Sequence, residues 1–159
     1  MKIRNATLQD LNELAEIEKI CFPPNQAASY EAIRKRLKVF SDHFWILEDD
    51  HIISFIDGLS TDQKDLTDEM YEHAEMHDPD GAWQMIFGVN TLPEYRRRGY
   101  AGQLIQTVIE ESRDKKKKGV VLTCLEEKIH YYASFGFINE GISDSIHGGD
   151  TWYQMRIKF

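Results

Sequence analysis

Three arginines run directly into a glycine-rich turn past the middle of the chain. The segment Pro93–Glu111 reads PEYRRRGYAGQLIQTVIEE, with Arg96–Arg98 directly before Gly99 and apolar residues at helical spacing after it. A helix start offers unpaired N–H groups and a partial positive charge, and glycine lets a ligand approach the backbone closely. Arginine side chains strengthen such a site. The segment therefore predicts an anion site, with an ordinary surface turn as the alternative.

This turn differs from two common nucleotide-binding motifs. It lacks the Lys-Ser/Thr ending of a P-loop, which disfavours nucleoside triphosphate hydrolysis. It also lacks the GxGxxG order of a dinucleotide-binding turn and follows a strand late in the chain. We therefore expect an anionic ligand of another kind.

Few other side chains have a spacing that supports catalysis or metal binding. Cys21 and Cys124 lack a CxxC spacing, so we expect separate, reduced thiols. Cys124 could be a nucleophile, but a small buried side chain is the favoured interpretation. His73 and His77 lie four residues apart without further ligands at a useful spacing, so no metal site is predicted. His130 is interpreted as a surface residue rather than a base.

Residues 61–80 are strongly acidic, and Lys64 is the only basic residue among them apart from histidines. A solvated helix and loop is the ordinary interpretation of such a run. The functional alternative is an acidic rim that attracts an amine.

Hydrophobic periodicity predicts the elements that must position these residues. We expect helices at 8–17, from Ser29 to about 37, at 99–118 and at 129–135, and strands at 3–6, 44–48, 52–56, 82–92, 120–124, 137–139 and 151–157. Thr7 is the expected N-cap of the first helix, with Asp10 completing the cap. Lys115–Lys118 are expected in the last turn of the third helix, with Gly119 as the residue that ends it. Gly88 within the long strand indicates a bulge or a close approach by a ligand.

The composition is that of one soluble α/β domain spanning residues 1–159. Apolar residues make up 42% and charged residues 29% of the 159 residues, without an apolar run long enough for a membrane span and without a signal segment. We therefore expect a cytoplasmic protein that is a monomer or a homodimer. The formal net charge of −8 argues against nucleic acid as the main partner and is compatible with a cationic substrate.

Two segments resemble motifs of the GNAT superfamily of acyl-CoA-dependent N-acetyltransferases. Arg96-x-x-Gly99-x-Ala101, after a strand and Pro-Glu-Tyr, resembles the superfamily's motif A, and Tyr131-Tyr-Ala-Ser-Phe-Gly-Phe resembles its later aromatic motif. Their separation and the order of strands and helices also fit. The resemblance implies a single-domain GNAT-like fold, with a mixed, mostly antiparallel central sheet flanked by helices, and it implies acetyl-CoA as co-substrate without a metal.

The resemblance also implies roles for individual residues. Backbone groups of the central strand would bind the pantetheine arm, and the Val89 N–H would bind the thioester oxygen as it gains negative charge. The turn would bind the pyrophosphate. Tyr132 would donate its phenolic proton to the departing thiolate, with core packing as the alternative. The predicted cofactor contacts are Val89, Asn90, Thr91, Arg96, Arg97, Arg98, Gly99, Tyr100, Ala101, Gly102 and Gln103.

A narrower resemblance to arylalkylamine (serotonin-type) N-acetyltransferases rests on three segments: Glu18-Lys-Ile-Cys-Phe-Pro, the acidic Thr67-Asp-Glu region before Pro79-Asp-Gly, and Thr123-Cys124. Two histidines of the animal enzymes that help to remove the amine proton are replaced here by Met85 and Phe87, which cannot act as bases. Proton removal then needs another route, such as a water chain to acidic residues. The expected amine-pocket residues are Phe22, Pro23, Gln26, Met85, Phe87, Thr123 and Cys124.

The sequence leaves three functions open. The first is acetyl transfer to a small, arylalkylamine-like primary amine by direct attack in a ternary complex. The second is acetylation of a protein N-terminus, a lysine or a polyamine. The third is a non-catalytic acyl-CoA sensor, against which the presence of Tyr132 argues.

Overall fold

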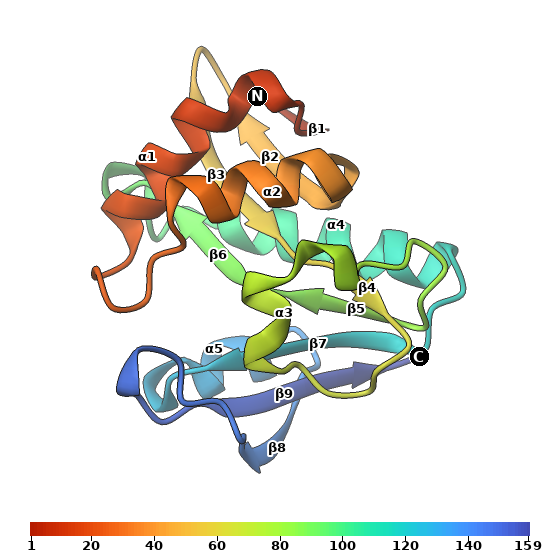
Figure 1. The fold of residues 1–159 in the computed structure, drawn as a ribbon. Helices are drawn as coiled ribbons and strands as arrows, with labels where there is room; N and C mark the ends of the chain where they lie inside the picture. Colours follow the sequence, from red (N-terminus) through yellow and green to blue (C-terminus); the bar gives the residue numbers. More distant parts are fainter.

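The computed structural model describes residues 1–159 (Figure 1). The α-helices are α1 (Leu11–Cys21), α2 (Tyr30–Phe40), α3 (Asp68–Glu72), α4 (Tyr100–Asp114) and α5 (Ile129–Ala133). The strands are β1 (Lys2–Asn5), β2 (Phe44–Glu48), β3 (Ile52–Asp57), β4 (Ser60–Thr61), β5 (Trp83–Ile86), β6 (Gly88–Thr91), β7 (Gly119–Cys124), β8 (Ile138–Ile142) and β9 (Tyr153–Lys158). Six single 3₁₀ turns lie between them: η1 (Leu8–Asp10), η2 (Ser41–His43), η3 (Ala74–Met76), η4 (Pro93–Tyr95), η5 (Glu126–Lys128) and η6 (His147–Gly149).

The strands form two sheets that meet at the middle of the molecule. Their orders are β1-β2-β3-β6 and β4-β5-β7-β9-β8. Every paired neighbour is antiparallel except β5 and β7, which are parallel because α4 connects the central strand to β7. The expected mixed, mostly antiparallel α/β architecture is therefore confirmed.

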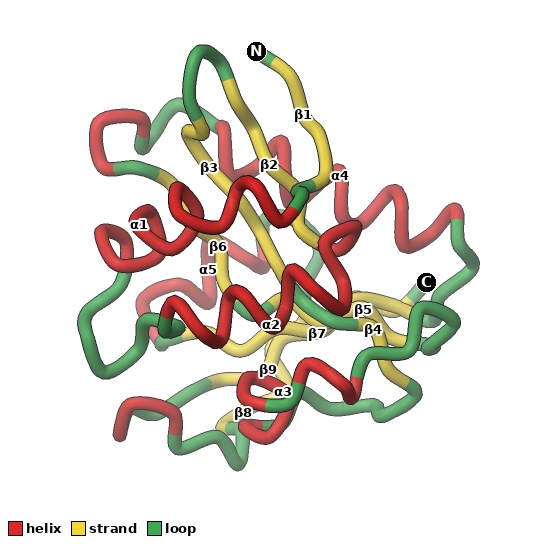
Figure 2. The backbone as a smooth tube through the Cα atoms, turned by 45° about the horizontal axis from the view of Figure 1, so that its top comes forward, coloured by secondary structure: helices red, strands yellow, loops and turns green.

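Helices cover both faces of the sheets (Figure 2). The helices α1 and α2 pack on one face over a core that includes Phe44 and Ile46, while α4 packs on the other over Trp45 and Leu47. Side chains alternate along a strand, so β2 is apolar at consecutive positions because each of its faces is buried. The segment Phe44–Glu48 has this continuous pattern, which is why its strand could be predicted.

The predicted single strand at 82–92 is in fact broken at Phe87. Its first part, β5, pairs with β4 and β7, and its second part, β6, pairs with β3 in the other sheet. Register pairing between β5 and β7 ends at Ile86 opposite Leu122. Beyond this point β6 leaves β7, and a gap opens between the two sheets.

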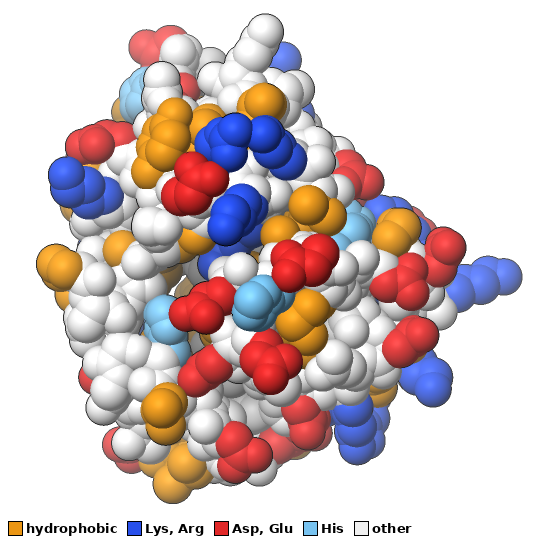
Figure 3. Space-filling model, viewed as in Figure 1, with side chains coloured by type: hydrophobic (Ala, Val, Ile, Leu, Met, Phe, Trp, Pro, Cys, Tyr) orange, Lys and Arg blue, Asp and Glu red, His pale blue; other side chains and the backbone are white.

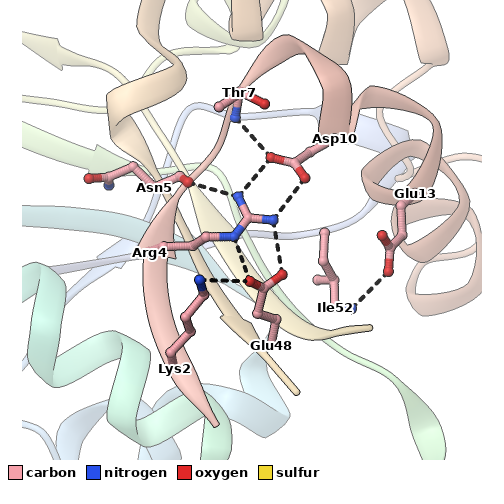
Figure 4. Close-up of polar contacts among 8 residues, drawn as sticks. All are labelled: Lys2, Arg4, Asn5, Thr7, Asp10, Glu13, Glu48 and Ile52. Carbon is pink, nitrogen blue, oxygen red and sulfur yellow. Dashed lines mark hydrogen bonds and ion pairs between the residues drawn. The ribbon is translucent and has the colours of Figure 1, made fainter. Parts of the chain in front are cut away.

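A carboxylate–guanidinium network fixes the N-terminal strand (Figure 4). Arg4 on β1 donates to both oxygens of Asp10 and to both oxygens of Glu48 on β2, at 2.9–3.0 Å. Asp10 also accepts from the Thr7 N–H at 2.8 Å, which completes the predicted capping box. This network ties β1 to both β2 and the start of the first helical segment.

The C-terminal end of α4 differs from the prediction. The helix ends at Asp114, and Lys116 adopts a left-handed conformation with φ 61° in the turn that follows. Lys117 is buried and donates its Nζ to the Gly81 carbonyl at 2.7 Å, so it is not a solvated cation of the last helical turn. Gly119 is the first residue of β7, where a Cβ would lie 1.9 Å from the Ile157 carbonyl oxygen. Close packing of two strands explains this glycine.

No helix of the protein combines the length and the apolar character that crossing a membrane requires.

Candidate active site

The gap between β6 and β7 presents free backbone groups on β6. Val89 lies opposite Ile56 on β3, and the Leu92 N–H donates to the Ile53 carbonyl. In an antiparallel pair, hydrogen-bonded and non-hydrogen-bonded positions alternate, so Asn90 bonds to β3 while Val89 does not. The N–H and C=O of Val89 therefore face the gap, where β7 no longer pairs with the strand.

The arginine-glycine turn lies at the start of α4, after β6 and η4. Arg97 and Gly99 are both left-handed, with φ 63° and 81°. The first intrahelical bond is the Gln103 N–H to the Gly99 carbonyl, so the three preceding N–H groups of α4 have no helical acceptor. Successive N–H groups in such a turn make an anion-binding concavity.

The arginines of the turn differ in what they contact. Arg96 is held in place, since its Nε donates to the Thr91 carbonyl at 2.9 Å. Arg98 lies over the Tyr95 ring at 5.7 Å, and neither Arg97 nor Arg98 forms an ion pair. Two exposed cations are therefore available beside the free N–H groups.

A cavity of about 170 Å³ lies beside the gap, lined by residues from both sheets and from the loops around them. Val89 and Gly88 line it from β6, Thr123 and Cys124 from β7, and Tyr132 from α5. A cavity of about 150 Å³ holds a benzene ring, so a ring-sized group fits here. Free backbone groups, a phenol and an apolar wall thus share one small space.

Tyr132 and Cys124 both keep their protons in this environment. Burial raises the pKa of the Tyr132 phenol, and the neighbouring Tyr131 and Cys124 raise it further. Burial also raises the pKa of the Cys124 thiol to about 11, with Glu127 adding to the effect. A thiol of this kind is a poor nucleophile at neutral pH. Tyr132 can donate a proton, whereas Cys124 is a small wall residue of the cavity.

A buried group of charged side chains forms the cavity wall on the α1 and α2 side. Glu18 of α1, Arg36 of α2 and Asp57 of β3 all line the cavity and are 5%, 4% and 1% exposed. Arg36 donates to Asp57 at 2.9 Å and to the Tyr71 carbonyl at 3.0 Å. Two carboxyl groups face one guanidinium, so the group is negative when both are ionised.

Burial raises the pKa values of both carboxyl groups of this wall. Burial, with the charge of Asp57, raises the pKa of Glu18 to about 7, while the Ala28 N–H, Arg36 and the Asn90 side chain oppose the shift. Burial also raises the pKa of Asp57 despite its bond to Arg36. Glu18 therefore changes its protonation near neutral pH.

Two loops are joined by hydrogen bonds beside the cavity. The Asn25 amide donates to the Gly148 carbonyl at 2.9 Å, and the Gln26 amide donates to Asp150 at 2.8 Å. His147 donates through Nε2 to the Gln26 carbonyl at 2.9 Å, and its ring stacks on Tyr71 at 5.0 Å. The segment between α1 and α2 is thus joined to the segment between β8 and β9, and both contribute lining residues to the cavity, among them Gln26 and His147.

Five of the seven predicted amine-pocket residues line this cavity: Phe22, Gln26, Phe87, Thr123 and Cys124. Two do not. Pro23 is exposed on the loop, and Met85 of β5 is fully buried in the core on the side opposite Ile86, because successive side chains of a strand point to opposite faces. Asn90 directs its backbone to β3 and its buried side chain to the α1 side of β6, away from the gap.

The acidic segment, residues 61–80, forms structural hydrogen bonds and contributes no carboxylate to the cavity. Asp68 accepts from the Ile146 N–H at 3.0 Å, and Asp65 accepts from Gln154 at 3.0 Å. Tyr71 is its only cavity residue. Figure 3 shows acidic side chains gathered on the face over α3, so the molecular surface there is negative without forming the pocket itself.

His73 and His77 do not face a common site. His73 is exposed beside Glu75, whereas His77 accepts from the Ser60 N–H and packs against His43 at 4.5 Å. No group of three or more His, Cys, Asp or Glu side chains is arranged to hold a metal ion.

Sequence reasoning missed the charged wall and its neighbours. Glu18 follows the apolar Ile17 on α1, and both Arg36 and Asp57 lie within otherwise apolar helix and strand patterns. A charged residue at a core position of an amphipathic element is an available signal, because such residues are seldom buried without a partner. Tyr71 and His147 carry no comparable signal, since their segments have no clear periodicity.

Comparison with known proteins agrees with this architecture. Residues 11–137 match the acetyltransferase (GNAT) family, whereas no curated protein matches the chain significantly. The GphF GNAT-like decarboxylase in complex with isobutyryl-CoA is similar in structure, with a TM-score of 0.85, 18% identity and coverage of 99% of each chain. The loading GNATL domain of CurA from Lyngbya majuscula is similar with a TM-score of 0.85 and 17% identity, and the match covers 99% of this chain and 96% of that chain.

The ribosomal-protein-S18-alanine N-acetyltransferase from Escherichia coli is also similar, with a TM-score of 0.73, 14% identity and coverage of 99% of this chain and 92% of that chain. At these identities the similarity shows a shared fold. The family match covers most of the chain, from α1 to the start of β8, and includes the turn, the gap and Tyr132. This chain belongs to the GNAT acetyltransferase family.

Proposed function

We propose that this protein transfers an acetyl group from acetyl-CoA to a small primary amine by direct attack in a ternary complex. The observation that carries the proposal is the small cavity beside the gap, which brings Val89 and Tyr132 together with a wall that holds two carboxyl groups and one guanidinium. Family membership supports the acyl-CoA part. The amine class rests on the cavity alone.

In this proposal the turn and β6 hold the cofactor. The pyrophosphate accepts hydrogen bonds from the N–H groups of Gly99, Tyr100, Ala101 and Gly102, with the side chains of Arg97 and Arg98 beside it. The pantetheine arm bonds to the free backbone groups of β6, which places the thioester at the inner end of the gap. These residues suit an anionic cofactor because their donors have no partners within the protein.

The chemical step then uses two groups. The amine nitrogen attacks the thioester carbon, and the Val89 N–H stabilises the negative charge that develops on the oxygen. When the carbon–sulfur bond breaks, Tyr132 gives its proton to the thiolate of coenzyme A. The proton that the new amide nitrogen must lose returns to Tyr132, which restores the phenol. Cys124 needs no part in this sequence, because attack is direct.

The shape of the cavity supports a small acceptor over a protein. The hydrogen bonds between Asn25 and Gly148 and between Gln26 and Asp150 hold two loops together beside the cavity, which leaves less room for an extended peptide. The wall includes the aromatic rings of Phe22, Phe87 and Trp152. An amine with an aromatic or alkyl body therefore matches both the size and the lining of the space.

The charge of the cavity disfavours a decarboxylase reaction of the kind named for GphF. The acyl group of such a substrate carries a carboxylate into the site. In this chain the carboxylate would lie beside Glu18 and Asp57, and the only guanidinium there already binds Asp57. Repulsion between like charges at low dielectric is costly, whereas an ammonium group is attracted.

The role of Tyr132 is tested by thiol release from acetyl-CoA with phenethylamine, tryptamine, spermidine and a short peptide as acceptors. Tyr132→Phe is expected to lower kcat roughly 10²–10³-fold with little change in acetyl-CoA affinity, because general acid catalysis contributes on that order. The matched control is Tyr131→Phe, since Tyr131 is adjacent, 38% exposed and outside the cavity lining. Equal activity of the two variants would contradict the acid role, and acetyl-CoA binding without turnover of any acceptor would contradict the enzyme.

A further inference from the structure

Glu18 occupies a place in the cavity that the proposed chemistry leaves unexplained. It lies near the C-terminal end of α1, at 5% exposure, directly across from the strand that is to hold the thioester. A buried carboxyl group is costly unless it has partners, and this one has few. The buried Glu18 side chain therefore either destabilises the fold without a benefit or has a function in the site.

The two oxygens of Glu18 differ in their contacts. Its Oε2 accepts from the Ala28 N–H at 3.0 Å, which fixes the side chain toward the cavity. Its Oε1 accepts no hydrogen bond of normal geometry, although the Asn90 side-chain amide lies close enough to lower the pKa of the carboxyl. Since Glu18 lines the cavity, Oε1 is the oxygen that faces a ligand there.

Groups from three other elements surround this carboxyl. Asp57 of β3 lies close enough to repel it, and Arg36 of α2 lies between the two while bonding to Asp57. Asn90 of β6 is fully buried beside it, and its side-chain amide, which forms no hydrogen bond of normal geometry elsewhere, lowers the pKa of the Glu18 carboxyl. Cys21, one turn further along α1, is a neutral neighbour whose thiol donates to the Thr91 carbonyl. Of these groups, Asp57 and Arg36 line the cavity together with Glu18, so the carboxyl faces the cavity within a charged wall.

Gly88 gives a ligand access to this wall from β6. A Cβ at Gly88 would lie 3.4 Å from the Asn90 amide nitrogen and 3.7 Å from the Phe22 ring, so the missing side chain leaves the space between them open. The next residue, Val89, turns its free N–H into the gap. A nitrogen atom between Glu18 and Gly88 would therefore lie next to a thioester held along β6.

We propose that Glu18 is the catalytic base of this site, taking the proton of a bound ammonium group through Oε1 so that the neutral amine can attack the thioester. Asp57 and Arg36 are positioning residues that hold the charge balance around it. The inference rests on the proposed acetyl transfer and assigns the proton acceptor that Met85 and Phe87 cannot supply.

The proton and charge balance is complete. The ammonium transfers one proton to the Glu18 carboxylate, which becomes a neutral acid, and the nitrogen lone pair forms the bond to the acetyl carbon. The carbon–sulfur bond then breaks, and Tyr132 and the amide nitrogen exchange the second proton as described above. Glu18 releases its proton to solvent after the products leave. A pKa of about 7 suits this cycle, because about half of the carboxyl groups are ionised at neutrality and the group can still hold a proton.

The experiment measures kcat/KM as a function of pH for two acceptors of similar shape: phenethylamine and its β,β-difluoro analogue, which is far less basic. Glu18→Gln is expected to lower kcat/KM for phenethylamine roughly 10²–10³-fold at pH 7. The loss should shrink toward pH 10, because phenethylamine is increasingly neutral there. It should also be much smaller for the difluoro amine, because that amine is already largely neutral and needs no base. Acetyl-CoA affinity should be unchanged.

Two further variants make the result specific. Glu16→Gln removes an exposed carboxyl from the same helix and should leave the profile unaltered. Glu18→Asp keeps a carboxyl and should retain more activity than Glu18→Gln above pH 7, which also covers the case in which the glutamine variant folds poorly. A loss that is equal at every pH and for both amines would assign Glu18 a structural role and overturn the proposal.

The outcome also separates this inference from the function on which it rests. Turnover by the wild type with no effect of Glu18→Gln would overturn the base while leaving acetyl transfer intact. Failure of the wild type to acetylate any amine would overturn both.

Discussion

Glu18 illustrates how one buried side chain can link stability to chemistry. Its pKa is about 7 in the folded protein and 4.5 as the ordinary value, so folding favours the protonated form. The stabilising effect of the proton is fully present below about pH 4.5 and is lost as the pH rises through about 7. The same shift that makes the carboxyl a suitable base thus lowers stability at the pH where the base works.

This linkage gives a prediction that does not depend on turnover. The free energy of unfolding of the wild type should fall relative to that of Glu18→Gln between pH 4.5 and 7, by about 1–3 kcal/mol, since one pKa unit corresponds to about 1.4 kcal/mol. Urea denaturation at several pH values measures it, with Glu16→Gln as the control. A constant difference between the two proteins would show that Glu18 does not titrate in this range.

Among the single residues, local patterns point to the turn and to Tyr132 as predicted site residues, whereas no local pattern points to Glu18, the proposed base. Arg96, Gly99 and Tyr132 belong to local patterns, in which the neighbours along the chain carry the information. Glu18 acquires its environment from Asp57 and Asn90, which lie on strands far away in sequence. Only the fold brings these groups together.

At the scale of elements, the break at Phe87 matters most for the site. A glycine within a strand predicted some irregularity at Gly88, yet the apolar run from Trp83 to Leu92 gave no sign that its halves belong to different sheets. The division depends on which strands pair with each half, and pairing is not a local property. The end of α4 escaped prediction for a similar reason, because Lys117 finds its carbonyl partners on another loop.

The hydrogen-bond network of Arg4 on β1 predicts that replacing Arg4 lowers the stability of the protein. Arg4→Gln removes bidentate bonds to Asp10 and Glu48, whose side chains are only 13% and 20% exposed. Since charge-assisted hydrogen bonds contribute about 1.5–3 kcal/mol each before solvent screening, the expected loss is about 1–3 kcal/mol. Thermal and urea unfolding measure the effect.

Lys2→Gln is the matched control for this network. Lys2 also reaches Glu48, at 3.6 Å, but its side chain is 68% exposed, so its removal should change stability by less than about 0.5 kcal/mol. If both variants lost the same stability, the ordering of β1 by Arg4 would be refuted.

At the scale of the whole molecule, the cavity is lined by segments distant in sequence that meet beside it. The loop after α1 meets the loop before β9, and the two sheets diverge beneath them. Fold class could be predicted from the alternation of strands and helices, since that pattern is spread along the entire chain. The junction of the two loops could not, because it depends on contacts between two irregular segments.

Separating these two loops should relax the choice of acceptor. Gly148 has φ 63°, and a Cβ there would lie 2.6 Å from the Asn25 carbonyl oxygen. Gly148→Ala should therefore raise the KM for phenethylamine several-fold and improve turnover of bulkier amines, with acetyl-CoA affinity unchanged. Gly149→Ala carries the same backbone strain, at φ 77°, without a neighbour within 4 Å. An equal change in both variants would mean that strain, not contact between the loops, is responsible.

The central claim is that a small amine, and not a protein, accepts the acetyl group from acetyl-CoA. The most direct measurement is a competition in one reaction, with acetyl-CoA, phenethylamine and a short peptide with a free N-terminus and a lysine at equal concentrations, followed by mass spectrometry of the products. We expect N-acetylphenethylamine as the main product, formed at least roughly tenfold faster than acetylated peptide, because the joined loops beside the cavity would hinder an extended chain. Preferential acetylation of the peptide would contradict it.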